Sequence, residues 1–381
     1  MISFIQPFGL HSHEHGGSQR IFQSLLDCNH PPVLSIDSNP FPSSGSSAAD
    51  EIQLPSRPNF GWLEYTRLQG SLGLFDRLYR SRFEARLRRI LVDRKVKLVH
   101  VLPHGYFFQS ACRVASELGI PYFLSVHDDL GHLLRGHPFI GELTEFMGKA
   151  WREARGVFAI SDEIGLEYCR RYGAREYRIV TDGLKYLAVA PQQRPAKCLR
   201  LYFMGLFHLS YAQNLRAVLD ALRIVRSRQP DWEIAVTCRS GKIAMPVHPD
   251  DVRVTVLPFA PAEEVDRDML SADLLYQPMP FEEHARLFSR FSLSTKMITY
   301  LGSGLPIFYH GPDDAAACTL LARHEAAVIC TTLDPEVIAD LLLDATARRE
   351  AIVQNALALA RSQFMLVDQQ RRFWEPVLAA L

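Results

Sequence analysis

Apolar runs of strand length alternate with helical spacing from one end of this chain to the other. In the first half, six runs predict strands, at Ile2–Ile5, Val33–Ile36, Lys97–Leu102, Tyr122–Val126, Val157–Ile160 and Arg178–Val180. Helical spacing lies between them, near Ser18–Leu26, Glu64–Asp93, Phe107–Leu118, Gly141–Glu153 and Asp162–Tyr172. This alternation is typical of parallel α/β sheets, in which helices connect successive strands.

The second half repeats the same scheme. Strands are predicted at Arg200–Met204, Glu233–Thr237, Val252–Val256, Leu274–Tyr276, Ile307–Tyr309 and Ala327–Ile329. Helices are predicted at Tyr211–Arg228, Pro261–Leu270, Thr295–Gly302, Ala315–Arg323, Pro335–Ala345 and Arg348–Arg361. A polar, proline-bearing stretch at 188–197 separates the halves, and the Pro/Ser/Gly-rich stretch Asn39–Pro58 predicts a loop. We therefore expect two Rossmann-like domains with a ligand cleft between them.

Composition narrows the class of protein. A length of 381 residues suits two α/β domains, and 42 basic against 42 acidic side chains argue against a nucleic-acid partner. The seven cysteines are scattered without the spacing of a zinc or redox motif, which favours reduced thiols in a cytoplasm. The N-terminus has no signal-peptide pattern, and no apolar run reaches membrane-spanning length. We expect a cytoplasmic protein.

The stretch Leu74–Lys97 combines many arginines with apolar residues at helical spacing. One interpretation is a domain helix with a solvated basic face. The alternative is a basic amphipathic helix that contacts an anionic surface at the inner face of a membrane. Both interpretations stay open on the sequence alone.

The segment Phe291–Pro306, FSLSTKMITYLGSGLP, is the most informative part of the chain. Ser294, or a serine two positions earlier, can cap a short helix whose first turn holds Thr295 and Lys296. Free amides, hydroxyl groups and a lysine at one helix start favour the binding of an anion. The sequence therefore predicts a phosphate or diphosphate site here.

A second candidate site follows the first strand, in GLHSHEHGGSQR. Gly16 and Gly17 allow a backbone to approach a phosphate or sugar, although the pattern lacks the dinucleotide-binding GxGxxG. The alternative is a simple flexible turn. His11, His13 and His15 alternate in this loop, but no matching acidic cluster accompanies them, so we expect no metal.

His127 and Asp128 follow the apolar strand Tyr122–Val126, where side chains point toward ligands in parallel sheets. A histidine there can bind a sugar hydroxyl or assist proton movement, and Asp128 is a second candidate for this work. The alternative role of Asp128 is to cap the following turn. Gly205 follows the first strand of the second half, with His208 close behind, and permits a diphosphate to approach the backbone.

In their order along the chain, these segments resemble a GT-B glycosyltransferase of the retaining family 4. Gly16-Gly17 with Arg20 resembles the family's GG-x-x-R after the first strand. Val157–Ser161 resembles its apolar strand ending in serine, and Asp182-Gly183 resembles its Asn-Gly turn before the interdomain linker.

The resemblance continues through the second half. Gly205 with Tyr211–Leu215 is similar to the family's donor segment, and Asp273–Pro278 is similar to its A-D-x-x-x-x-P. Ser294–Pro306 resembles S-x-K-x-x-E-Y-x-x-x-G-x-P, and the tail with Trp374 resembles a helix that crosses back to the first domain. The resemblance covers some three quarters of the chain.

The chain departs from the family at the donor site. Leu206 and Gln213 stand where the family has an arginine and a lysine, and Thr299 stands where it has a glutamate. Arg290 and Lys296 are candidates to replace the lost positive charge. His208 is a third candidate.

The resemblance implies an acceptor-binding domain at 1–187, a linker at 188–197, a nucleotide-sugar-binding domain at 198–361 and a returning helix at 362–381. It implies transfer of a sugar from a nucleotide-diphosphate donor to a saccharide or lipid-linked acceptor with retention, without a required metal or cofactor. A different class remains open: a catalytically silent GT-B protein that binds a glycan or accompanies an active transferase.

Overall fold

The computed structural model describes residues 1–11, 16–40, 50–60, 63, 66, 71–189, 197–207, 209–241 and 252–381. The chain forms two compact units, Met1–Gly183 with Leu366–Leu381, and Leu184–Met365. The first unit ends four residues before the expected position 187 and resumes four residues after the expected position 362, whereas the second unit begins at 184, ahead of the expected linker at 188–197. His13, His15, His208 and most of the expected linker lie outside the described residues.

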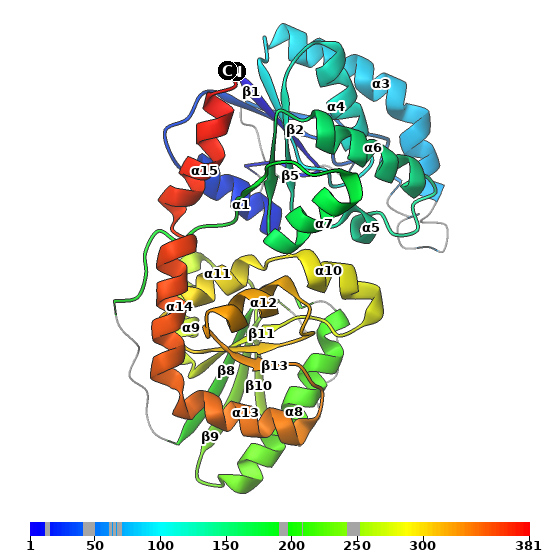
Figure 1. Cartoon of the computed structure of the whole chain (residues 1–381). Coiled ribbons are helices and arrows are strands. Elements are labelled where there is room, and N and C mark those ends of the chain that lie inside the picture. Colours follow the sequence, from blue (N-terminus) through cyan, green and yellow to red (C-terminus); the bar gives the residue numbers. More distant parts are fainter. Residues whose placement is uncertain are drawn as a thin grey trace. The chain divides into compact units, whose positions relative to one another are not determined.

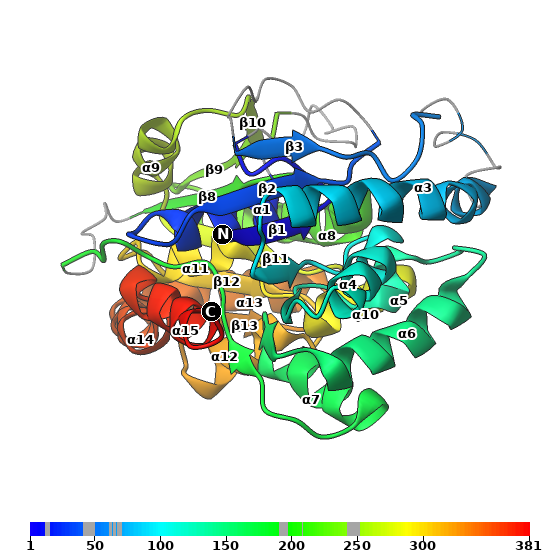
Figure 2. The same ribbon diagram turned by 90° about the horizontal axis from the view of Figure 1, so that it is seen from above.

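The first unit contains a sheet of seven parallel strands in the order β3-β2-β1-β4-β5-β6-β7. The strands are β1 (Ile2–Gln6), β2 (Val33–Asp37), β3 (Glu51–Gln53), β4 (Leu98–Val101), β5 (Tyr122–Val126), β6 (Gly156–Ala159) and β7 (Arg178–Ile179). The predicted strands are confirmed, but the expected loop Asn39–Pro58 is wrong in part. It contains the edge strand β3, which pairs with β2 (Figure 2).

Helices cover both faces of this sheet, with α3, α4 and α6 on one side and α1 and α15 on the other (Figure 1). The bounds are α1 (Gly17–Leu26), α3 (Leu72–Asp93), α4 (Phe107–Glu117), α5 (Leu130–Leu133), α6 (Ile140–Glu153), α7 (Asp162–Tyr172) and α15 (Leu366–Leu378). Because both faces are covered, all residues of β1, β2 and β5 are buried, as expected for a parallel sheet. The predicted start of α7 is confirmed, since the Ser161 hydroxyl accepts a hydrogen bond from the Ile164 amide.

The C-terminal helix α15 belongs to the first unit. The indole nitrogen of Trp374 donates a hydrogen bond to the Leu25 carbonyl in α1 at 2.8 Å. Gln369 is fully buried and accepts a hydrogen bond from the Thr181 amide at 3.0 Å. Phe373 is also fully buried and packs its ring 4.8 Å from that of Phe158. The tail therefore completes the core of the first unit.

The second unit contains six parallel strands in the order β10-β9-β8-β11-β12-β13. The strands are β8 (Cys198–Met204), β9 (Glu233–Arg239), β10 (Arg253–Leu257), β11 (Leu274–Pro278), β12 (Ile307–His310) and β13 (Val328–Cys330). Its helices are α8 (Ala212–Arg228), α9 (Ala262–Ser271), α10 (Arg286–Phe291), α11 (Thr295–Leu301), α12 (Ala316–Arg323), α13 (Pro335–Ala347) and α14 (Arg349–Gln363). The α/β class with two Rossmann-like parts is therefore confirmed.

Alternation along β8 shows how this second sheet is packed. Leu201 and Phe203 face one hydrophobic cluster, whereas Tyr202 and Met204 face the other, as the two-residue period of a strand requires. Parallel strands place all their carboxyl ends at one edge, where ligands bind in such sheets. Within the described ranges, no helix is both long and apolar enough to cross a membrane.

Candidate functional site

His127 directly follows β5 in the first unit and is almost completely buried, with 5% of its surface exposed. Its Nδ1 lies 2.9 Å from the Ser18 hydroxyl, at the start of α1, and its ring packs 5.3 Å from that of Phe22. The structure thus joins the end of β5 to the first turn of α1. These are two of the segments that the sequence singled out.

His104 was not predicted from the sequence, although it follows β4 as His127 follows β5. Its ring lies edge-on to His127, with centroids 6.2 Å apart, and its Nε2 lies 3.5 Å from an Asp128 carboxylate oxygen. The cap that the sequence considered for Asp128 belongs instead to Asp129, which accepts a hydrogen bond from the Gly131 amide at 2.9 Å. Asp128 is therefore left to face His104.

Burial controls the charge of these histidines. It lowers the pKa of His127 well below the ordinary value, and the neighbouring His104 and His100 lower the pKa further. Burial also lowers the pKa of His104, against the attraction of the Asp128 carboxylate. His127 is consequently a neutral imidazole at physiological pH, able to exchange hydrogen bonds with a hydroxyl group.

Gly16 and Gly17 form the exposed N-terminal start of α1, with Gly16 extended at the N-cap. Arg20 lies one turn later, and its Nε is 2.7 Å from a carboxylate oxygen of Asp182, whose side chain is almost fully buried. The other oxygen of Asp182 accepts hydrogen bonds at 2.9 Å from the Ser24 hydroxyl and from the backbone amide that follows Asp182. Arg20 and Asp182 therefore hold α1 against the turn that ends the first unit.

In the second unit, Gly205 follows β8 with a φ of +94°, in the region that favours glycine. A Cβ at this position would lie 3.7 Å from Cε of Lys296, which comes from the first turn of α11. The structure thus brings together Gly205 and Lys296, which the sequence placed in two separate motifs. A backbone without a side chain lies directly beside a lysine.

The surroundings of Lys296 are aromatic. Its ammonium lies 4.2 Å from the ring centroid of Phe203 and 5.2 Å from that of Tyr211. It forms no ion pair with the residues that the structure describes. Burial lowers the pKa of this lysine to about 7. A lysine that is only partly protonated at neutral pH, and that pairs with no described carboxylate, is well suited to bind a negatively charged ligand.

The other residues predicted to bind the donor lie in α11, at its N-cap or in the preceding helix α10. Ser294 occupies the N-cap position without the capping hydrogen bond that the sequence suggested, and Thr295 follows it. The Thr299 hydroxyl donates a hydrogen bond to the Thr295 carbonyl at 3.3 Å, within the helix itself. Arg290 is exposed on α10, with its guanidinium 5.1 Å from the Phe291 ring. Lys296 is thus the cation that lies against Gly205.

Two other family-like positions have structural roles. Asn214 is fully buried at the start of α8 and donates hydrogen bonds to the carbonyls of Met279 at 2.9 Å and His310 at 3.0 Å. Asp273 accepts hydrogen bonds from the backbone and side chain of Arg200, at 3.0 Å and 2.9 Å. These hydrogen bonds hold β8, β11 and β12 in register. The presence of Asn214 and Asp273 in the two motifs is therefore explained by their structural role.

A metal site has no counterpart in the described part of the chain, where no group of three or more His, Cys, Asp or Glu side chains is placed to hold an ion. Of the three alternating histidines, only His11 is described. It lies exposed near Asp50, with 3.8 Å between Nε2 and a carboxylate oxygen.

Residues 49–184 match the model of the glycosyl transferase 4-like domain family. Among solved structures, HepE from Anabaena, in complex with UDP and glucose, is 13% identical with a TM-score of 0.67, and the match covers 100% of this chain and 99% of HepE. A UDP-forming alpha,alpha-trehalose-phosphate synthase from Burkholderia vietnamiensis is 14% identical with a TM-score of 0.66, over 99% of this chain and 97% of the synthase. A second such synthase, from Burkholderia xenovorans in complex with glucose-6-phosphate, is 11% identical with a TM-score of 0.67, over 99% of both chains. The search of curated proteins found no match.

The full-length match to these solved structures shows the fold of the chain. The family match shows which type of domain residues 49–184 resemble. Both agree with the resemblance that the order of motifs indicated. Residues 49–184 are thus similar to the glycosyl transferase 4-like domain family, and the chain as a whole has the GT-B fold of these solved structures.

Proposed function

We propose that this protein moves a sugar from a nucleotide-diphosphate donor to a saccharide or lipid-linked acceptor, with retention at the anomeric carbon. The observation that supports this proposal most directly is the position of Lys296 beside Gly205. A partly buried ammonium lies there over two aromatic rings and against a backbone that carries no side chain. A bound diphosphate would supply the negatively charged partner that Lys296 does not find among the described residues.

The donor diphosphate would lie along Gly205 in the second unit, with its oxygens near Lys296 and the Ser294 and Thr295 hydroxyls. As the bond to the sugar breaks, negative charge grows on the leaving diphosphate. A cation placed at that charge stabilises the transition state more than the ground state. Because its pKa is about 7, Lys296 can also take up a proton when the diphosphate binds.

The acceptor would lie on the first unit, near Gly17 and the group formed by Ser18, His104, His127 and Asp128. Neutral His127 would orient the acceptor hydroxyl, and the Asp128 carboxylate would attract its proton. Retention and the type of acceptor follow from the family resemblance. Uridine diphosphate sugars are the first donors to test, since HepE was solved with UDP and glucose.

We propose a cytoplasmic location, where nucleotide sugars and reduced thiols occur together. All seven cysteines are free, which fits such a compartment.

A second candidate function is supported by the residues at the donor site. Leu206 is 56% exposed, and Gln213 is also exposed, so neither position supplies a cation to a diphosphate. Thr299 binds its own helix, and its hydroxyl cannot replace a carboxylate on a ribose. These features favour a GT-B protein that binds a glycan or accompanies an active transferase without transferring sugar.

A donor screen that detects release of nucleoside diphosphate would separate the two functions. We expect release with at least one nucleotide sugar, and its loss in Lys296→Met and His127→Ala. Lys197→Met is the matched control, because this lysine is exposed in the same unit and pairs with Asp231 at 3.5 Å. Silence across a broad panel, with glycan binding intact by calorimetry, would establish the non-catalytic alternative instead.

A further inference from the structure

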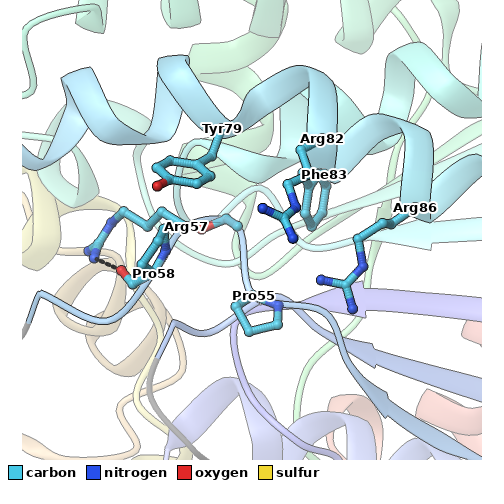
Figure 3. Close-up of a pocket in the computed structure, with 8 residues that line it drawn as sticks. Pro55, Arg57, Pro58, Tyr79, Arg82, Phe83 and Arg86 are labelled. Carbon is cyan, nitrogen blue, oxygen red and sulfur yellow. Dashed lines mark hydrogen bonds between the residues drawn. The ribbon is translucent and has the colours of Figure 1, made fainter.

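The first unit contains a pocket of about 230 Å³ between helix α3 and the segment that follows the edge strand β3 (Figure 3). It is lined by Pro55, Ser56, Arg57, Pro58, Tyr79, Arg82, Phe83 and Arg86. Three of these residues are arginines and none is acidic. The pocket is thus a basic site in a different unit from Gly205 and Lys296.

The floor of the pocket is fixed by Arg57, which is 9% exposed. Its Nε lies 3.3 Å from a carboxylate oxygen of Asp76 on α3, and the Ser56 hydroxyl donates a hydrogen bond to the same oxygen at 3.3 Å. These bonds hold the segment after β3 against the helix. They also neutralise Asp76, so that this carboxylate is not available to the other arginines.

Arg82 and Arg86 lie one helical turn apart on α3, and both point toward Pro55 (Figure 3). Both are exposed, and neither forms an ion pair or hydrogen bond with any residue in the described ranges. The nearby acidic side chain of α3, Glu84, is engaged with Arg80 and Arg113, at 3.9 Å and 3.8 Å, and with Ser110. Like charges four residues apart destabilise a helix, so a bound anion would remove a repulsion that the protein alone retains.

We propose that this pocket binds the phosphate group of a ligand. Two planar guanidinium groups on one helix face match the oxygens of a phosphate, and an aromatic side chain, Tyr79, lines the space beside them. The volume is below the roughly 300–1,000 Å³ typical of sites for drug-sized ligands, so the pocket suits a phosphate with a small attached group. A sugar phosphate and the head group of a lipid carry this same chemistry.

The inference does not depend on glycosyl transfer, because an anion can occupy the pocket whether or not the donor site is active. The test therefore uses Lys296→Met as its background, in which the proposed donor site has lost its cation. Calorimetry and thermal unfolding of this full-length protein would be measured with inorganic phosphate, pyrophosphate and glucose 6-phosphate. Vesicles of phosphatidylcholine, with and without phosphatidylglycerol, form a separate arm.

We expect binding of at least one soluble phosphate, and an affinity loss of about tenfold or more in Arg82→Gln/Arg86→Gln. The control Arg89→Gln/Arg94→Gln removes the same charge from exposed positions of α3 and its C-cap that do not line the pocket. It should keep the affinity. If binding depends equally on both pairs of arginines, or if neither a soluble phosphate nor the anionic vesicles bind, the proposal is wrong.

The vesicle arm identifies the source of the phosphate. Binding to anionic vesicles that fails in Arg82→Gln/Arg86→Gln but persists in the control would assign the pocket to a lipid head group. Equal loss in both pairs would instead show a diffuse attraction between α3 and a charged surface, which would overturn the pocket as the site. Competition between glucose 6-phosphate and anionic vesicles would support one shared site.

Discussion

Lys296 forms no ion pair with any of the residues that the structure describes. Its ammonium faces the rings of Phe203 and Tyr211, and burial lowers its pKa to about 7. A bound diphosphate would stabilise the protonated form and raise that pKa again. If the proposed donor binds here, its binding and the uptake of a proton would be linked at this residue.

We predict that affinity for a nucleotide sugar falls as the pH rises above about 7, by up to about tenfold per pH unit, because the free protein then loses the proton that the complex keeps. Lys296→Arg should remove this dependence, since a guanidinium stays charged. Calorimetry in buffers of different ionisation enthalpy would count the protons taken up. A pH slope that is the same in wild type and Lys296→Arg would contradict the role of this lysine.

A second prediction concerns His100, which is buried among aromatic rings and shares a hydrogen bond of 2.8 Å with the Ser125 hydroxyl. Burial lowers its pKa to about 3, whereas an unfolded histidine titrates near 6.5. The stability contribution of neutral His100 is therefore present above about pH 6.5 and lost as the pH falls. One such histidine costs about 1.4 kcal/mol of unfolding free energy at pH 5.5.

The variant His100→Phe/Ser125→Ala removes both partners of this hydrogen bond, so that neither is left buried and unpaired. The stability of this variant relative to wild type should improve by about 1.4 kcal/mol between neutral pH and pH 5.5, measured by urea unfolding. An unchanged difference between the two proteins would show that His100 does not carry this acid sensitivity.

The sequence predicted the positions of Lys296 and His127 because each directly follows a recognisable strand or turn. It did not predict that Lys296 would face Gly205, since that contact depends on how α11 lies against the end of β8. His104 was missed for a related reason. Its partner Asp128 is 24 residues away, and only the pairing of β4 with β5 brings the two together.

The helix α15 is stabilised by packing against strands that lie far from it in the sequence. The ring of its fully buried Phe373 lies within 6 Å of three rings from the sheet, at 5.9 Å from Phe4, 5.3 Å from His100 and 4.8 Å from Phe158. These partners come from β1, β4 and β6. The helix therefore covers the middle of the sheet in the first unit.

We predict that Phe373→Ala lowers the stability of the first unit by about 3–5 kcal/mol, because it removes a large ring from a closed core. The control Val367→Ala changes a residue of the same helix that is 68% exposed, and should cost less than about 0.5 kcal/mol. Hydrogen exchange would locate the effect. Faster exchange in Phe373→Ala should occur in 1–183, whereas an equal increase in both units would contradict the assignment.

The regular elements were predictable because buried parallel strands form continuous apolar runs, and the helices between them keep a clear spacing. The elements that were missed are short. The edge strand β3 has three residues in a Pro/Ser/Gly-rich stretch, α5 has four and α10 has six. Such elements depend on pairing or packing with neighbours, so their own sequence carries little of the pattern.

For the whole molecule, the two units differ in how the chain builds them. The second unit is one continuous segment, Leu184–Met365, whereas the first needs Leu366–Leu381 in addition to Met1–Gly183. The second unit also has its own sheet and clusters of buried side chains. The two units should therefore differ in stability when they are produced as the separate fragments 1–183 and 184–365.

We predict that a fragment of residues 184–365 unfolds cooperatively on heating, followed by circular dichroism. A fragment of residues 1–183 should show no cooperative transition, because the apolar surface that Phe373 and Trp374 cover would be exposed. Addition of a peptide with the sequence of residues 366–381 should restore the transition. A stable fragment 1–183 without the peptide would show that α15 is dispensable.

The placement of α15 has a consequence for how the protein is made. Because α15 follows the whole of the second unit in the sequence, the first unit begins to be translated first but is completed after the second unit. The second unit can fold while the tail is still being synthesised. A chain that stops before residue 366 would then contain a complete second unit and an incomplete first unit. The helix α15 thus makes completion of the first unit dependent on the translation of residues 366–381.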